Sequence, residues 1–119
     1  MKLGKYYIGV DIGTTSTKTV IYGENAEIIS THHVEYPLYS PVPEFAEQDP
    51  EEIFWAVVNS IKGAIDKEKI PGKNIEFVSL SAAMHSLMAV DRHGIPLTKC
   101  ITWADQRAAK WAEKEKGER

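Results

Sequence analysis

The feature that most constrains the fold is a pair of apolar runs near the amino terminus, separated by a turn of small residues. Residues 6–10 are largely apolar, residues 13–16 read Gly-Thr-Thr-Ser, and residues 17–22 alternate between apolar and polar side chains. Two runs of this kind predict two strands joined by a tight turn. Asp11 stands just before the turn and Lys18 just after it, so the hairpin also carries two opposite charges.

The turn has the composition of a phosphate-binding turn. The amides and hydroxyls of Thr14, Thr15 and Ser16 can converge on anion oxygens, and Gly13 gives the backbone freedom and leaves room for a ligand. Asp11 is placed to hold, through waters, the magnesium ion that accompanies a nucleoside triphosphate. The alternative is an ordinary hairpin, in which these residues only shape the turn and favour strands. A Walker A loop and a dinucleotide fingerprint do not fit, because their glycine spacing is absent.

The order of the remaining elements predicts an α/β fold. A third strand is expected over residues 26–35, followed by a loop that prolines keep irregular. Asp49 followed by Pro50 predicts the start of a helix. The apolar residues of that helix recur at helical spacing: Ile53, Phe54, Val57, Val58, Ile61, Ala64 and Ile65. Residues 75–80 predict a buried strand, and a strand reached through a helix is usually parallel to an earlier one.

Two more elements are expected towards the carboxyl end. Residues 86–97 predict a hairpin around the turn Arg92-His93-Gly94. Asp105 is a candidate cap for a final helix, whose apolar side would carry Ala108, Ala109, Trp111 and Ala112.

Composition argues against several function classes. The 119 residues carry a formal net charge of -3, whereas proteins that bind nucleic acid usually present a basic face. No apolar run approaches the length needed to span a membrane. The single cysteine, Cys100, cannot form an internal disulfide and is compatible with a reducing cytoplasm. The expectation is therefore a cytoplasmic protein that binds neither nucleic acid nor membrane.

Four segments resemble a known family. Residues 11–18, Asp-Ile-Gly-Thr-Thr-Ser-Thr-Lys, are similar to the first phosphate-binding hairpin of the actin-like ATPase superfamily and, within it, to the opening of the FGGY carbohydrate kinases. Residues 47–52, 81–86 and 101–107 resemble later segments of that family, in the same order. The resemblance spans nearly the whole chain, and its last two segments look most like gluconate kinases.

The resemblance implies a fold and an activity. The fold is a ribonuclease H-like half-domain of the actin-like ATPases, with a mixed sheet of three antiparallel strands, then a helix and a parallel strand. The activity is phosphorylation of a sugar or sugar acid, foremost gluconate to 6-phosphogluconate, with ATP and Mg²⁺ as cofactors. Two alternatives stay open: a xylulose, other ketose or polyol kinase of the same family, and a non-catalytic actin-like module that binds nucleotide.

The resemblance also implies that residues 1–119 are the amino-terminal part of the first domain of a longer kinase. The catalytic aspartate and the second domain would then lie beyond residue 119, and the 119 residues alone would be inactive. The expected partners are a small sugar or sugar acid, the remainder of the same kinase chain and, in the complete protein, a second copy in a homodimer.

Finally, the resemblance implies roles for ten residues. On the nucleotide side they are Asp11, which would also hold the metal, with Gly13, Thr14, Thr15, Ser16 and Lys18. On the sugar side they are Met84, His85, Trp103 and Asp105. Four of them have a plainer alternative: Lys18 as a solubilising strand residue, His85 as a structural histidine, Trp103 as core filler and Asp105 as a helix cap. Glycerol kinases carry an arginine at the position of Lys18 and Arg-Glu at that of Met84-His85.

Overall fold

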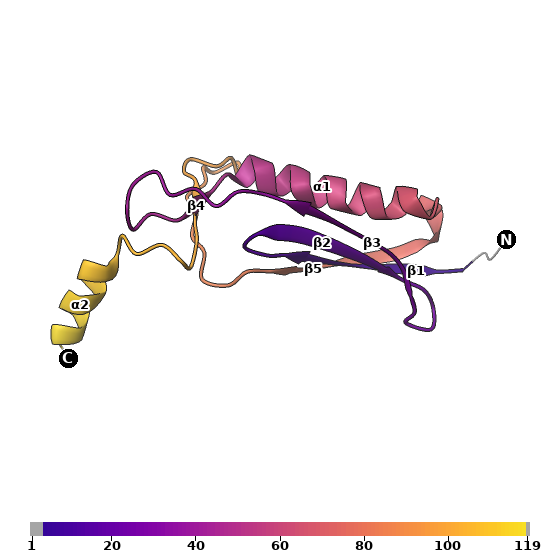
Figure 1. Ribbon diagram of the computed structural model, residues 1–119, viewed down its shortest axis with the longest axis horizontal. Coiled ribbons are helices and arrows are strands. Elements are labelled where there is room, and N and C mark those ends of the chain that lie inside the picture. The colour runs from indigo at the N-terminus through magenta and orange to yellow at the C-terminus, as the bar shows by residue number, and fades with distance from the viewer. Residues whose placement is uncertain (1–3, 119) are drawn as a thin grey trace. The chain divides into compact units, whose positions relative to one another are not determined.

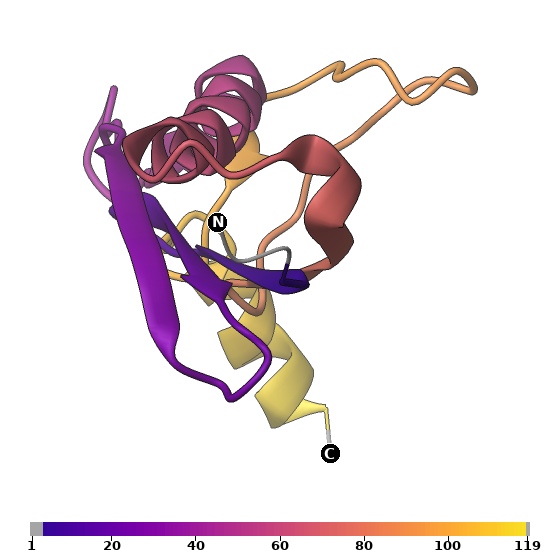
Figure 2. The same ribbon diagram turned by 90° about the vertical axis from the view of Figure 1, so that its right-hand side faces the viewer.

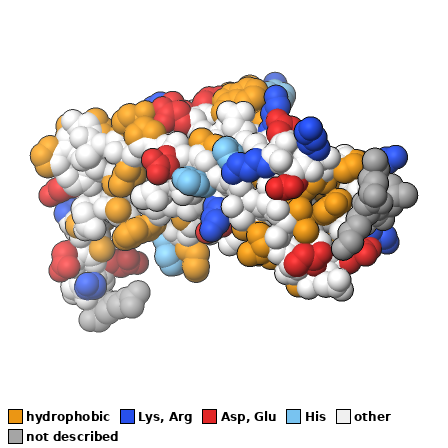
Figure 3. All heavy atoms as spheres, turned by 45° about the vertical axis from the view of Figure 1, so that its right-hand side comes forward, with side chains coloured by type: hydrophobic (Ala, Val, Ile, Leu, Met, Phe, Trp, Pro, Cys, Tyr) orange, Lys and Arg blue, Asp and Glu red, His pale blue; other side chains and the backbone are white. Residues whose placement is uncertain are grey.

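The computed structural model describes residues 4–118, which form two compact units. The first, called the sheet unit, comprises residues 4–36 and Glu51–Ala83. The second, called the loop unit, comprises Pro37–Pro50 and residues 84–118. No helix within residues 4–118 has the length and apolar character needed to cross a membrane. On the molecular face drawn in Figure 3, acidic and basic side chains are interspersed.

The sheet unit confirms the expected mixed topology. Its strands are β1 (Tyr6–Ile12), β2 (Ser16–Tyr22), β3 (Ile28–Glu35) and β5 (Ile75–Ala82), in the spatial order β3-β2-β1-β5. Neighbouring strands among β1, β2 and β3 are antiparallel, whereas β5 runs parallel to β1. The crossover between them contains helix α1 (Pro50–Lys67) and the short 3₁₀ helix η1 (Gly72–Asn74). Figure 1 shows α1 lying along the sheet.

The core lies between α1 and one face of the sheet. Ile8, Val10 and Ile21 point to this face and are almost fully buried, as the two-residue period of strands requires. Figure 2 shows that helix α1 lies on one side of the strands β1, β2 and β3. Each fully buried isoleucine stabilises the fold by about 1.5–3 kcal/mol relative to an exposed one.

Small side chains bring α1 close to the sheet. Its fully buried residues are Ala56, Ser60 and Ala64, four residues apart. The Ser60 hydroxyl donates a hydrogen bond to Thr19 Oγ1 at 2.7 Å, which satisfies both buried polar groups. Phe54, one of the apolar residues at helical spacing, does not pack on the sheet. Its side chain is exposed and contacts the ring of Trp55 edge-on, near the start of the helix.

Strand β5 pairs as expected, but it is not buried. Phe77, Val78 and Leu80 have exposed fractions of 56%, 46% and 62%. The physical reason is that β5 is the edge strand beside β1, while the buried core is centred on β1, β2 and α1. From β5, Ile75 packs against this core.

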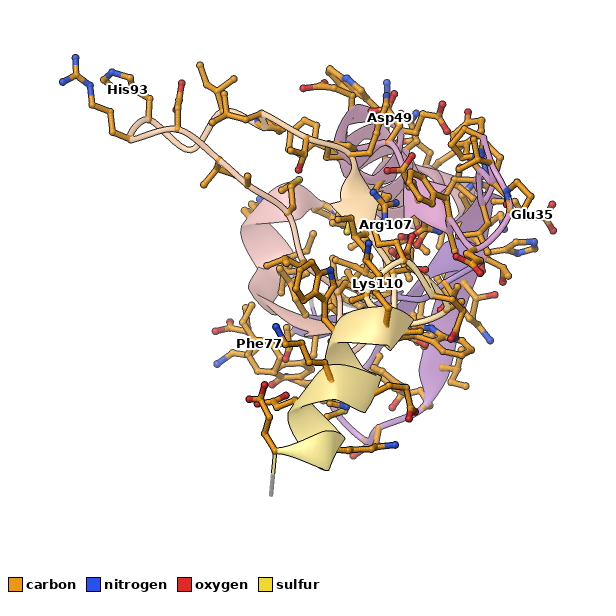
Figure 4. All side chains as sticks on the ribbon, turned by 90° about the vertical axis from the view of Figure 1, so that its left-hand side faces the viewer. Glu35, Asp49, Phe77, His93, Arg107 and Lys110 are labelled. Atoms are coloured by element: carbon orange, nitrogen blue, oxygen red, sulfur yellow. The ribbon has the colours of Figure 1, made fainter. Side chains whose placement is uncertain are left out.

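The loop unit holds little regular structure. Strands β4 (Glu47–Gln48) and β6 (Cys100–Ile101) pair antiparallel, and α2 covers Ala109–Gly117. The expected hairpin over residues 86–97 is present as a loop. Backbone hydrogen bonds and a single antiparallel residue pair, Val90 with Pro96, close this loop, but its two sides do not form regular strands. Gly94 takes a left-handed φ of 79° in its turn, and Figure 4 shows His93 at the loop's tip.

The expectation that Asp105 caps the final helix is wrong. Helix α2 begins four residues later, and its cap position, Ala108, makes no side-chain capping hydrogen bond. The expected apolar side of the helix is also not buried: α2 has no buried residue, and Trp111 is 61% exposed. The ammonium groups of Lys110 and Lys114 lie 5.3 Å and 5.8 Å from the centre of the Trp111 ring.

Candidate functional site

The turn between β1 and β2 is held by backbone contacts. The Gly13 amide donates a hydrogen bond to the Ser16 carbonyl at 2.9 Å. A Cβ on Gly13 would lie only 3.1 Å from that same oxygen. Glycine is favoured here because it has no Cβ to make this close contact. Gly13 was also expected to adopt a backbone conformation that other residues avoid. This expectation is wrong, because the φ of Gly13 is not left-handed; among the described glycines, Gly94 has a left-handed φ. The turn is followed directly by β2, without a helix.

Three polar residues meet across the strands beside this turn. Asp11 on β1 lies opposite Lys18 on β2 and opposite Ser81 on β5. All three line one open pocket of about 370 Å³ on the sheet, together with Ser79. Sequence reasoning missed Ser79 and Ser81. Their two-residue spacing was visible in the sequence, but only the parallel register places them beside Asp11.

Asp11 is the carboxylate in this pocket that could hold magnesium. Its side chain is exposed, and it takes part in no ion pair with another residue in the range 4–118. Those residues hold no cluster of three or more metal-ligating side chains. A single carboxylate suits Mg²⁺, which usually keeps several waters and shares its remaining ligands with substrate phosphates. The donor set therefore fits a nucleotide-bound magnesium ion and does not suit a metal held by protein ligands alone.

The expected sugar-side residues belong to the loop unit, and three of them are exposed. Met84 and Trp103 have exposed fractions of 71% and 57%, so Trp103 does not fill a core formed by the described residues. His85 is also exposed, and its backbone takes a left-handed φ of 60°. This conformation is uncommon for residues other than glycine, although histidine adopts it more readily than most. Strain of this kind concentrates at functional sites.

Asp105, the fourth expected sugar-side residue, is engaged by the protein. Its side chain is only 3% exposed. The carboxylate accepts hydrogen bonds from the Ala46 amide at 2.8 Å, from the Arg107 amide at 3.0 Å and from the Arg107 guanidinium at 2.7 Å. These bonds use both oxygens, so a sugar hydroxyl would have to compete with them for Asp105.

Arg107 joins two segments of the loop unit. Its guanidinium also binds the Glu47 carboxylate on β4 at 2.8 Å and lies 3.6 Å from the centre of the Phe45 ring. The Thr102 amide, in turn, donates to the Ala46 carbonyl at 3.0 Å. These contacts hold residues 102–107 against residues 44–48, and Trp103 belongs to the segment that they hold. Figure 4 labels Arg107.

Comparison with known proteins assigns this arrangement to a family. Residues 6–118 match the N-terminal domain of the FGGY family of carbohydrate kinases. The chain belongs to this family.

Gluconokinases, xylulose kinases and glycerol kinases are among the proteins similar to the chain. It is 50% identical over 113 residues to a gluconokinase from Bacillus subtilis (strain 168), a match that covers 95% of this chain and 22% of the relative. A gluconate kinase from Lactobacillus acidophilus superposes with a TM-score of 0.89 at 39% identity, covering 97% of this chain and 23% of that one. A ligand-bound xylulose kinase from the same organism gives 0.88 at 39% identity, covering 96% and 23%. The chain thus spans about a fifth of the length of these relatives.

Replacing Arg107 with methionine in the complete FGGY protein should lower its melting temperature at neutral pH, because two carboxylates would lose their cation. The hydrogen bond from Arg107 is the main cause that holds the pKa of Asp105 well below its ordinary value. A lowered pKa stabilises the folded state above the unfolded value of about 3.9, and this stabilisation is lost as the pH falls towards the folded value. The difference in melting temperature between wild type and variant should therefore shrink as pH falls from about 7 to about 3.

The matched control for this variant is Lys110→Met, which removes one positive charge from the exposed surface of α2. It should change the melting temperature little at either pH, because exposed charge contacts contribute little. The melting-temperature difference between wild type and Arg107→Met could instead be independent of pH, or equal to that of the control. Either result would show that Arg107 does not stabilise the loop unit through Asp105.

Proposed function

We propose that the complete protein is an ATP-dependent carbohydrate kinase whose substrate is gluconate, which it converts to 6-phosphogluconate. The observation that carries this proposal is the 50% identity to a gluconokinase across 95% of the chain, which includes both the phosphate turn and the Met84-His85 segment. Residues 1–119 would be the amino-terminal part of the first kinase domain, and the second domain and the aspartate that accepts the sugar proton would lie outside them.

On the nucleotide side, the turn and its neighbours would bind the phosphates of ATP. Backbone amides and hydroxyls of Thr14, Thr15 and Ser16 suit phosphate oxygens. Lys18 would add a positive charge near them, although a lysine lacks the two-pronged geometry of an arginine. Asp11 would hold magnesium, which when bound supplies neutralisation of the charge on the transferring phosphoryl group.

On the sugar side, exposed residues of the loop unit would bind the substrate. His85 would donate a hydrogen bond to a hydroxyl or carboxylate oxygen, and Met84 would pack along the carbon chain. The exposed indole of Trp103 would provide an apolar wall. Asp105 would act mainly by holding the segment of Trp103, since its oxygens already bind Ala46 and Arg107. Positioning of this kind provides much of the catalysis in phosphoryl transfer.

The remainder of the same chain is the partner that we propose for strand β5. Phe77, Val78 and Leu80 leave apolar surface uncovered on an edge strand, and proteins rarely leave such an edge open. The chain spans 22% of the gluconokinase it matches, so a complete protein of that length has ample polypeptide to cover the edge. A homodimer of the complete protein and a cytoplasmic location complete this proposal.

A xylulose kinase is the second candidate, favoured by the xylulose kinase structure that matches as well as the gluconate kinase structure does. The test is a steady-state screen of the complete enzyme with gluconate, xylulose and glycerol at saturating Mg-ATP. We expect kcat/KM for gluconate to exceed the others by about tenfold or more, a difference of about 1.4 kcal/mol in transition-state binding. A preference for xylulose would overturn the gluconate assignment. Nucleotide binding without phosphorylation of any sugar would instead favour the non-catalytic module.

A further inference from the structure

Tyr36 lies beneath the phosphate turn and contacts it through both its backbone and its side chain. It immediately follows Glu35, the last residue of β3, which Figure 4 labels. Its amide donates a hydrogen bond to the Thr15 carbonyl at 3.1 Å, and its hydroxyl donates one to the Gly13 carbonyl. The aromatic ring is buried, with 7% of the residue exposed. Tyr36 therefore binds two carbonyl groups of one short turn.

A second hydroxyl completes this contact. Thr17 Oγ1 lies 3.3 Å from the Tyr36 hydroxyl oxygen and is fully buried. Burial is the main cause that raises the pKa of Tyr36, the hydrogen bond with Thr17 lowers it, and the charge of Asp11 raises it further. The hydroxyl consequently stays protonated at neutral pH and remains a donor to Gly13.

The hydrogen bond from Tyr36 to the Gly13 carbonyl also fixes the direction of the next amide, that of Thr14. The Gly13 carbonyl and the Thr14 amide belong to one peptide plane, and the described chain contains no cis peptide bond. In a planar trans peptide the C=O and the N–H point in opposite directions. When the Tyr36 hydroxyl holds the Gly13 oxygen, it fixes the plane of the peptide between Gly13 and Thr14 and, with it, the conformation of the turn.

We propose that Tyr36 is a positioning residue that holds the turn at residues 13–16 in the conformation in which it binds the phosphates of a nucleoside triphosphate. The proposal rests on the function proposed above, because it assumes that this turn binds phosphate. Preorganised amides raise affinity because ligand binding does not have to order them. Tyr36 was absent from the residues expected on sequence grounds, since it lies 20 residues beyond Ser16 in the chain.

The test is Tyr36→Phe in the complete enzyme, which keeps the buried ring and removes only the hydroxyl. Calorimetry should show that Kd for Mg-ATP rises by about two- to tenfold, the effect of one neutral hydrogen bond. Kd for adenosine should stay unchanged, because adenosine has no phosphate. In steady-state kinetics, KM for ATP should rise while KM for gluconate stays constant.

The matched control is Tyr7→Phe. The Tyr7 ring packs against Phe77, with ring centres 5.3 Å apart, near the opposite end of β1 from the turn. This control should leave Kd for Mg-ATP and adenosine at wild-type values. Melting temperatures of all three proteins, together with the fraction of folded molecules, allow each Kd to be stated per folded molecule.

The possible failures are distinguishable. A Tyr36→Phe enzyme with a lower melting temperature but wild-type Kd for Mg-ATP would overturn the positioning role while leaving the kinase proposal intact. Equal weakening of ATP and adenosine binding would overturn it too, because the defect would not concern phosphate. A wild-type enzyme that binds no Mg-ATP would overturn the proposed function and, with it, the role of Tyr36.

Discussion

Replacing Asp11 with asparagine in the complete enzyme should lower kcat by about a hundredfold or more, with little change in fold or in sugar affinity. Metal and oxyanion contacts of this kind contribute several kcal/mol to transition-state stabilisation. Asparagine keeps the size of the side chain, yet it removes the charge that would hold magnesium in the pocket shared with Lys18 and Ser81. The half-saturating concentration of Mg²⁺ should rise in the same variant, which provides a measurement independent of kcat.

The alternative role for Asp11 gives a different result. An aspartate that only shapes the hairpin would, when replaced, lower the melting temperature and leave turnover per folded molecule unchanged. Asp66→Asn is the matched control, since Asp66 is an exposed aspartate near the end of α1. It should change neither the Mg²⁺ dependence nor kcat. A destabilised Asp11→Asn enzyme with normal kcat would exclude the magnesium role.

The strand order around this turn could be predicted because local and long-range preferences agree. The alternating residues of β2 and the Asp49-Pro50 start of α1 are local features, and both are present in the structure. The parallel pairing of β1 with β5 follows from the helical crossover.

Burial was harder to predict, because hydropathy does not report which face of an element is covered. Phe54 and Leu80 are strongly apolar but exposed, whereas Ala56 and Ser60 are buried. Small residues are buried where two backbones must approach closely, a requirement that a pattern of large apolar residues does not reveal. The exposure of β5 likewise depends on its position at the sheet edge, which a one-dimensional pattern does not encode.

The residues of the candidate site also divide into those that the sequence could predict and those that it could not. Asp11 and Lys18 stand close together in the sequence, so their pairing across one hairpin was predictable. Ser81 and Tyr36 reach the neighbourhood of the turn only through pairing of β5 and the end of β3. Asp105 was assigned a cap role from its local position and a ligand role from the family resemblance. Its partner Arg107 is local, only two residues away, but its other partner, the Ala46 amide, lies 59 residues away in the chain, and no local rule could identify that contact.

Replacing His85 with alanine should lower kcat/KM for the sugar by about tenfold to a hundredfold and leave KM for ATP nearly unchanged. The lost donor would leave a substrate oxygen unpaired in a closed site, at a cost of about 1–3 kcal/mol. Alanine has a second effect at this position, because it adopts the left-handed φ of 60° less readily than histidine does. A loss of activity in this variant alone therefore does not separate the imidazole from the backbone.

His85→Gly separates the two contributions, because glycine removes the side chain and also adopts a left-handed φ without strain. If the imidazole binds the sugar, the glycine and alanine variants should lose sugar kcat/KM to a similar extent, while the glycine variant keeps the higher melting temperature. If only the backbone conformation matters, glycine should retain wild-type kinetics and alanine should not. His93→Ala is the matched control, since His93 lies at the tip of the same loop, and it should leave both KM values unchanged. Wild-type sugar kinetics in His85→Gly would exclude His85 as a substrate ligand and assign its role to the turn that follows β5.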